Sequence, residues 1–135
     1  MEIPESYSEL LRGPSPTVLS VVAQDGSVQS SLVWSDYEAG TFSINMLRGA
    51  PKLNSLNRNR KATLLKIDPD DEDIYISIRC TLISVETHDA IAHLNKLTKR
   101  HMGKECWYGD VVPDNKEEKL KRVVVYLQAE KIYFT

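Results

Sequence analysis

The sequence predicts a mainly β fold, in which an antiparallel barrel of six or seven strands is accompanied by a few helices. Several short segments alternate apolar and polar residues with the period of a half-buried strand. Tight turns such as Asp25-Gly26 and Glu38-Ala39-Gly40 join consecutive segments, as antiparallel neighbours require. Helical spacing of apolar residues is confined to a few segments, so helices decorate the sheet rather than alternate with its strands.

Length and charge narrow the possible classes of protein. The 135 residues have the length of one ordinary domain, and we expect a single domain over residues 1–135. The formal net charge of -2 gives no overall attraction to nucleic acid or to anionic lipid. No apolar run approaches the roughly 18 residues of a membrane span, and the N-terminus is acidic where a secretory signal is basic. We therefore expect a cytoplasmic protein that binds neither nucleic acid nor a membrane.

The first part of the chain predicts a helix followed by a hairpin. A short helix over residues 6–12 ends at Gly13-Pro14. Residues 17–23 are rich in β-branched side chains, and after the Asp25-Gly26 turn residues 27–37 continue as one second strand. The next expected strands cover residues 41–47, with Phe42, Ile44 and Met46 inward, then 61–67 and 74–86. Residues 120–127 and 131–134 are either two strands or one long bent strand interrupted at 128–130. The remaining expected helices are a short one after residue 50 and a longer one over residues 88–101, which Gly103 ends before a loop over residues 104–119.

The stretch 45–56 has the clearest chemical signal, because a strand ends there and a helix begins with Pro51 in its first turn. The unpaired amides and the positive dipole end of a helix start favour an anion such as phosphate. Arg48 and Lys52 add two cations, and Gly49 lets the backbone turn tightly. The alternative is an ordinary strand-to-helix connection with a solvated arginine and lysine.

Other motifs for catalysis or metal binding are weak. His88, His93 and His101 lack the spacing of about four residues that a two-histidine helical metal site needs, so they are interpreted as surface histidines. The acidic run 68–73 lacks the glycine and closing glutamate of a calcium loop. We therefore predict no metal site, and no nucleophile-base set identifies a catalytic side chain. A phosphate site without a protein acid or base suits a cofactor that carries its own chemistry.

A series of short motifs runs in order along nearly the whole chain: Thr17-Val18-Leu19-Ser20-Val21, Val33-Trp34, Asn45, Arg48-Gly49-x-x-Lys52, Asp68-Pro69, Ile78-Arg79 and Glu130-Lys131. Together they resemble the pyridoxamine 5'-phosphate oxidase-like split-barrel superfamily, and within it the small actinobacterial-type oxidoreductases that use flavin mononucleotide (FMN) or the deazaflavin coenzyme F-420. The resemblance implies a split β-barrel homodimer with two cofactor sites at the subunit interface, each built from both chains.

The resemblance also implies which residues hold the cofactor. The segment 48–52 would grip its phosphate, and the strands around residues 30–34 and 45–47 would run beside its ring system, with main-chain amides on the polar edge. The aromatic pair at 107–108 would approach the ring from the other subunit. The predicted cofactor-binding residues are therefore Arg48, Gly49, Lys52, Asn45, Met46, Leu47, Ser31, Val33, Trp107 and Tyr108.

The chain also departs from the family pattern. Leu32 stands where the family often has proline, and Ser35 stands where an aromatic residue is common, so the ring pocket is expected to differ in shape. Lys61 and Lys66 on the next strand are either further cations for the phosphate or solvated lysines.

The function that the resemblance implies is an oxidoreductase in which bound FMN or F-420, with F-420 slightly favoured, transfers hydride to an unidentified small molecule. The protein would anchor the phosphate, orient the ring and exclude water. The first alternative is a non-catalytic protein that carries flavin, F-420, haem or another tetrapyrrole in the same groove. The second is a dimeric structural domain whose groove is empty.

Overall fold

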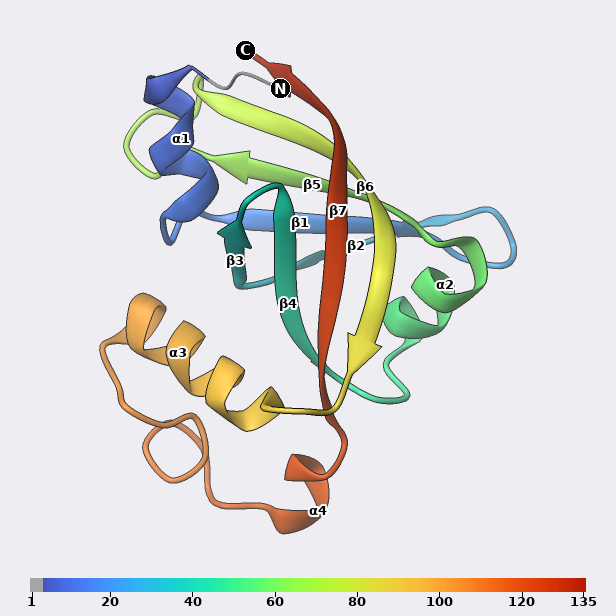
Figure 1. The fold of residues 1–135 in the computed structure, drawn as a ribbon, viewed down its shortest axis with the longest axis vertical. Coiled ribbons are helices and arrows are strands. Elements are labelled where there is room, and N and C mark those ends of the chain that lie inside the picture. The colour runs from blue at the N-terminus through green and yellow to red at the C-terminus, as the bar shows by residue number, and fades with distance from the viewer. Residues whose placement is uncertain (1–3) are drawn as a thin grey trace.

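The computed structural model describes residues 4–135, so the first three residues of the acidic N-terminus considered above lie outside the described residues. Figure 1 shows one sheet with helices around it. The strands are β1 (Thr17–Val22), β2 (Val28–Leu32), β3 (Ser35–Glu38), β4 (Thr41–Leu47), β5 (Lys61–Ile67), β6 (Tyr75–Glu86) and β7 (Arg122–Phe134). The helices are α1 (Glu5–Arg12), α2 (Pro51–Asn59), α3 (Ala90–Met102) and α4 (Lys116–Lys119).

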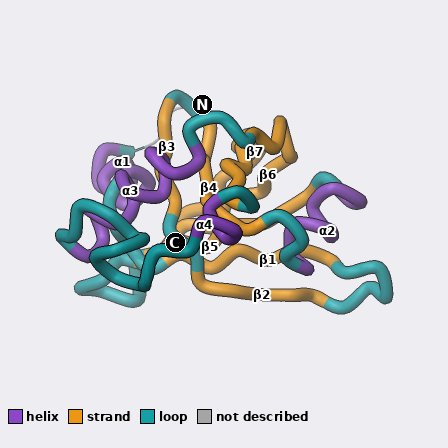
Figure 2. The backbone as a smooth tube through the Cα atoms, turned by 90° about the horizontal axis from the view of Figure 1, so that it is seen from below, coloured by secondary structure: helices purple, strands orange, loops and turns teal. Residues whose placement is uncertain are grey.

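All strand pairs in the 7-stranded sheet are antiparallel, and the strand order is β2-β1-β5-β6-β7-β4-β3. The long β6 and β7 bend across the middle of the molecule and bring the two ends of the sheet toward each other (Figures 1 and 2). The sheet does not close, because β2 and β3 are its two edges. The predicted antiparallel barrel is therefore present in a split form.

The two edge strands follow each other directly in the sequence. The prediction of one strand over residues 27–37 is wrong in this respect, because β2 ends at Leu32 and β3 begins at Ser35. The Val33 amide donates to the Thr17 carbonyl at 3.0 Å and so still belongs to the β1 side. Ser35 is already opposite Ile44 of β4 at the other edge. Only two residues, Val33 and Trp34, carry the chain across the split.

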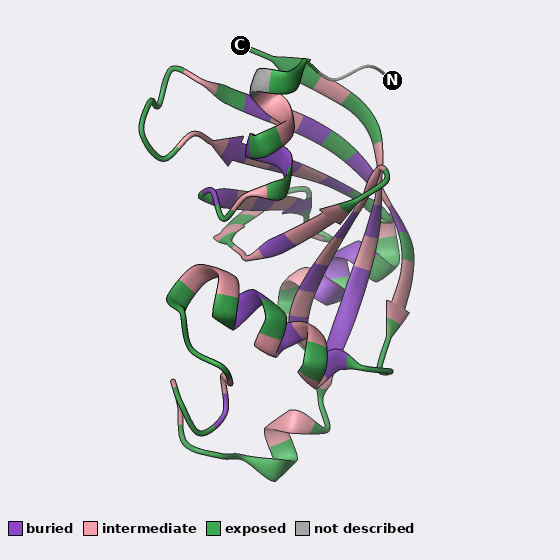
Figure 3. Cartoon of the chain, turned by 60° about the vertical axis from the view of Figure 1, so that its left-hand side comes forward, coloured by how far each residue is buried: buried purple, intermediate pink, exposed green. Residues whose placement is uncertain are grey.

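The core lies inside the curved sheet and follows the period-2 pattern of the strands (Figure 3). Phe42, Ile44 and Met46 point inward as predicted, with exposed fractions of at most 3%. Helices α1 and α2 extend this core with buried leucines. The leucines that they supply are Leu10 and Leu11 from α1, and Leu53 and Leu56 from α2.

Helix α3 covers the outer face of the sheet at β4 and β7, and buries Leu94, Leu97 and Thr98. It ends, as predicted, at Gly103, whose φ of 69° is a left-handed conformation that glycine adopts at little cost. The segment between α3 and β7, predicted as a loop, contains the single helical turn α4, capped by the Asn115 side chain.

Strand β7 is continuous through residues 128–130, so of the two alternatives that the sequence left open, one long bent strand is confirmed. Where β6 pairs with β7, Arg79 of β6 is opposite Lys131, and the next residue, Cys80, is opposite Ala129. Glu130 is therefore an extra residue, which bends the strand as a bulge does without ending it.

The central strand β5 offers a test of the packing. Leu64 is fully buried, so Leu64→Ala should leave a cavity and lower the free energy of unfolding by about 2–5 kcal/mol. Leu120 is 78% exposed, and Leu120→Ala should change that free energy by less than about 0.5 kcal/mol. Urea denaturation followed by circular dichroism measures both, and equal losses in the two variants would contradict the placement of the core.

Candidate functional site

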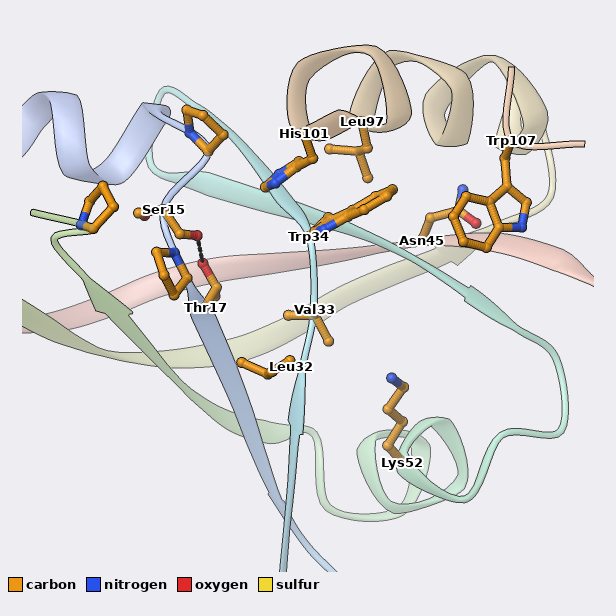
Figure 4. Close-up of a pocket in the computed structure, with 13 residues that line it drawn as sticks. Ser15, Thr17, Leu32, Val33, Trp34, Asn45, Lys52, Leu97, His101 and Trp107 are labelled. Atoms are coloured by element: carbon orange, nitrogen blue, oxygen red, sulfur yellow. Dashed lines mark hydrogen bonds between the residues drawn. The ribbon is translucent and has the colours of Figure 1, made fainter. Parts of the chain in front are cut away.

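A pocket of about 510 Å³ opens at the split (Figure 4). Its walls come from the β2–β3 crossing, the segment before β1, the end of β4, the start of α2, helix α3 and the loop after α3. Its lining residues are Pro14, Ser15, Pro16, Thr17, Leu32, Val33, Trp34, Asn45, Lys52, Pro69, Leu97, His101 and Trp107. Elements that are far apart in the sequence therefore contribute to one concave site, as is typical of small-molecule sites.

Aromatic rings form one wall of the pocket. The Trp34 indole stacks on the His101 imidazole with ring centroids 4.8 Å apart and planes 7° apart. Trp107 meets Trp34 edge-on, with centroids 5.7 Å apart. Trp34 belongs to the crossing segment, so the same two residues that bridge the split also supply this wall. Broad π surfaces of this kind suit a flat ligand.

Main-chain donors accompany this wall. Amides in an antiparallel edge strand point alternately toward the neighbouring strand and away from it. The Val33 amide is bonded to Thr17, so by alternation the Leu32 and Trp34 amides face away from β1. Ser31 has the same parity as Val33, so its amide points toward β1. The Leu32 and Trp34 amides beside the pocket are therefore directed away from β1, whereas those of the predicted Ser31 and Val33 are directed toward it.

Lys52 provides a cation at one end of the pocket. It follows Pro51 in the first turn of α2, and Figure 4 shows its ammonium directed toward Val33 and the pocket. Burial, and then the nearby charge of Arg122, lowers the pKa of Lys52. Pro51 has no N–H, and the Leu53 and Asn54 amides donate to the Ala50 carbonyl, so the Lys52 amide is the first-turn donor left without a helical acceptor. A half-buried cation next to a second cation and a helix start favours an anion.

The other cation of the predicted pair lies elsewhere. Arg48 is exposed, and its Nη2 donates to the Leu120 carbonyl at 3.5 Å, outside the pocket lining. Gly49 has a φ of 92°, so the tight turn expected there is present. Of the predicted site residues, the structure brings together at the pocket Lys52, Asn45, Val33 and Trp107, whereas Arg48, Gly49, Met46, Leu47, Ser31 and Tyr108 do not line it.

Asn45 is held by a polar network under α3. Its Nδ2 donates to the Ala90 carbonyl at 2.7 Å and lies 3.2 Å from His93 Nδ1. His93 Nε2 lies 2.9 Å from Ser43 Oγ. Burial lowers the pKa of His93 to about 4, so the ring is neutral at pH 7. With Nδ1 accepting from Asn45, the Nε2 proton goes to Ser43. The interpretation of His93 as a surface histidine is therefore wrong.

Arg122 extends the network toward Lys52. Its Nη1 donates to Asn45 Oδ1 at 3.4 Å and its Nε donates to the Tyr108 hydroxyl at 2.9 Å. Glu118 pairs with Arg122 Nη2 at 3.3 Å and accepts from the Tyr108 hydroxyl at 2.8 Å. Tyr108 therefore acts beside the pocket by fixing Arg122, rather than by lining the pocket itself.

Two residues outside the predicted cofactor-binding set matter for the site. Trp34 belongs to the segment expected beside the ring, and it forms the aromatic wall. Lys66 is only 1% exposed, so its interpretation as a solvated lysine is wrong. Its position two residues after Leu64 and four after Ala62 places it on the inner face of β5. That alternation was the signal that would have revealed it.

Within residues 4–135, no group of three or more His, Cys, Asp or Glu side chains is placed to hold a metal ion. Across the same described part of the chain, every helix is too short or too polar to cross a membrane.

The His93 network predicts a pH dependence of stability. An unfolded histidine titrates near 6.5 and folded His93 near 4, so the unfolded state binds the extra proton first as pH falls. Stability should therefore fall between about pH 6.5 and 4, by up to about 1.4 kcal/mol per pH unit from this group. Urea denaturation across this range should show a shallower fall for His93→Gln.

The matched control is His88→Gln, because the His88 side chain is 89% exposed. It should keep the slope of the wild type. An unchanged slope in His93→Gln would contradict the neutral, buried state of His93.

Comparisons with known proteins bear on the fold. No protein-family model matches the sequence, and no curated protein matches it by sequence. A solved structure named F420 Reductase is 21% identical with a TM-score of 0.84, covering 97% of this chain and 98% of its own. A Listeria innocua structure, named as a candidate pyridoxamine 5'-phosphate oxidase, is 16% identical with a TM-score of 0.70, covering 98% of both chains.

General Stress Protein 26 from Bacillus anthracis is 20% identical with a TM-score of 0.69, covering 99% of this chain and 94% of its own. These similarities span nearly the full length of each chain. The protein therefore shares the fold of these solved structures, an antiparallel barrel that stays split between β2 and β3.

Proposed function

We propose that this protein is an oxidoreductase that binds FMN or F-420 in the pocket at the split. The observation that carries the proposal is the arrangement of the pocket, with a half-buried Lys52 at a helix start and an aromatic wall along its length. Both cofactors combine a phosphate with a flat tricycle that has a polar edge. The ammonium and main-chain amide of Lys52 at the start of α2 match the phosphate, and the Trp34 indole with the neighbouring Leu32 and Trp34 amides matches the ring.

The residues of the pocket would bind and orient the cofactor, which supplies hydride transfer when bound. Lys52 anchors the phosphate, and Arg122 adds positive charge behind it. Leu32, Val33 and Trp107 exclude water from the ring. Asn45 lines the same space, and its side chain is fixed by the bonds to Ala90, His93 and Arg122, so it enters the site preorganised.

The similarity to a structure named F420 Reductase supports F-420 over FMN, although the name describes that protein and not this one. The candidate pyridoxamine 5'-phosphate oxidase among the similar structures supports the wider flavin class. Absorbance spectra distinguish the two cofactors, so titration of the purified protein with FMN and with F-420 tests the proposal. Absence of micromolar binding by either cofactor would contradict it. Tight binding without reduction or reoxidation by any substrate would identify a carrier rather than an enzyme.

Lys52→Ala gives the residue-level test. Loss of a charged donor should weaken binding of the cofactor by about 1.5–3 kcal/mol, measured by fluorescence or calorimetric titration. The matched control is Lys61→Ala, because the Lys61 side chain is exposed and bonds Thr81 outside the pocket. An unchanged affinity in Lys52→Ala would place the phosphate elsewhere.

We also propose a homodimer in which a second copy covers the pocket mouth. On the edge strand β2, Val28 is 65% exposed and Leu32 is 76% exposed, and Leu32 also lines the pocket. An exposed apolar edge strand is a surface that proteins normally cover. A second copy seated there would complete the enclosure of the ring.

Val28→Asp should shift the mass measured by light scattering toward that of the monomer, because it places a charge in the apolar contact. Leu120→Asp changes a residue that is 78% exposed on the α4–β7 connection, and it should leave the mass unchanged. A monomeric wild type at tens of micromolar would refute the dimer.

A further inference from the structure

Next to the pocket, and not among its lining residues, lies the buried ammonium of Lys66. Its Nζ donates to Thr17 Oγ1 at 2.9 Å and to Ser35 Oγ at 3.3 Å. These neutral hydroxyls take two of the three N–H bonds. Among the ion pairs of the described residues, none includes Lys66. Burying a cation without a carboxylate is costly, so a function near this charge is expected.

The surroundings of Lys66 are also positively charged. Arg100 and Lys96 both pair with Asp36, at 3.0 and 2.7 Å, so one carboxylate serves two cations. Burial, and then the charge of Arg100, lowers the pKa of Lys66 to about 8, which leaves it mostly protonated at pH 7. Burial, and then the charges of Lys66 and Arg100, lowers the pKa of His101. Lys66, Arg100, Lys96, Asp36 and His101 thus form a cluster that carries an excess of positive charge.

This cluster borders the end of the pocket away from Lys52. Two neighbours of Lys66, Thr17 and His101, line the pocket. Thr17 accepts a hydrogen bond from Lys66, and the charge of Lys66 helps to lower the pKa of His101. Figure 4 shows Ser15 and Thr17 at one end, Lys52 at the other and Val33 with Trp34 between them. The Nε2 atom of His101 is buried and has no hydrogen-bond partner among the described residues.

We propose that the end of the pocket beside Lys66 and His101 is a second anion-binding subsite, which takes the carboxylate or phosphate group of the substrate. The proposal rests on the proposed function, since it leaves the Lys52 end to the cofactor phosphate. The anion compensates the charge of Lys66 and gives the unpaired nitrogen of His101 a partner. The apolar body of the substrate lies against Trp34 and the neighbouring prolines Pro14, Pro16 and Pro69.

Two probes, phenylphosphate and benzoate, distinguish a phosphate from a carboxylate as the bound anion. Each is titrated into the purified protein, with and without saturating FMN, and binding is followed by Trp fluorescence. The informative variant is Lys66→Gln, which keeps donors for the two hydroxyls and removes the charge. Lys61→Gln on the same strand is the matched control. We expect micromolar to millimolar binding of one probe, weakened on the order of tenfold or more in Lys66→Gln only.

FMN affinity in the same variants separates this proposal from the proposed function. Unchanged FMN binding with weakened probe binding supports the second subsite. Equal probe affinity in Lys66→Gln and the wild type refutes it and leaves Lys66 as a tie between strands. Loss of FMN rather than probe binding also refutes it, because Lys66 would then hold the cofactor phosphate. Failure of FMN to bind the wild type contradicts the proposed function alone.

If Lys66→Gln does not fold, His101→Phe provides an independent test. Phenylalanine retains an aromatic ring against Trp34 and removes both ring nitrogens. The variant should bind the probe several-fold more weakly than the wild type. An unchanged probe affinity would refute the role of His101 and with it the subsite.

Discussion

The fold and the pocket depend on one constraint, namely that two residues carry the chain from one edge of the sheet to the other. Val33 is still bonded to Thr17 of β1, and Ser35 is already opposite Ile44 of β4. A two-residue connection brings the edges β2 and β3 close together, but it leaves no length for a strand ladder between them. The barrel consequently stays split there. The crossing residues, with Trp34 foremost, become the wall of a cavity rather than part of a core.

Side chains, in place of a main-chain ladder, hold the split together. Lys66 reaches from β5 to hydroxyls on β1 and β3, and Arg100 of α3 pairs with Asp36 of β3. These ties place cations beside one end of the cavity, while the start of α2 places Lys52 at the other. The means by which the open barrel is stabilised thus gives the pocket two electropositive ends with an aromatic surface between them. This charge pattern matches a ligand system with separate anionic groups better than a purely apolar ligand.

Local sequence patterns predicted most strands and the start of α2 at Pro51. Apolar–polar alternation, turn residues and proline each act over a few positions, so they can be recognised without the tertiary structure. The split was not predictable in this way: residues 27–37 are continuously strand-like, and only tertiary pairing assigns their two halves to opposite edges. Arg48 and Lys52 looked equivalent in the sequence, yet the turn at Gly49 leaves one exposed and directs the other into the pocket. His93 likewise appeared to be a surface residue until β4 supplied its buried polar partners.

The proposed binding mode, in which the pocket holds a phosphate-bearing tricyclic cofactor with its phosphate at Lys52, can be observed in a crystal. A crystal structure of the protein with FMN or F-420 bound measures this directly. It should show a phosphate oxygen within about 4 Å of Lys52 Nζ, with the ring beside Val33 and Trp34. A phosphate at the Lys66 end, or a cofactor bound outside the split, would contradict the claim.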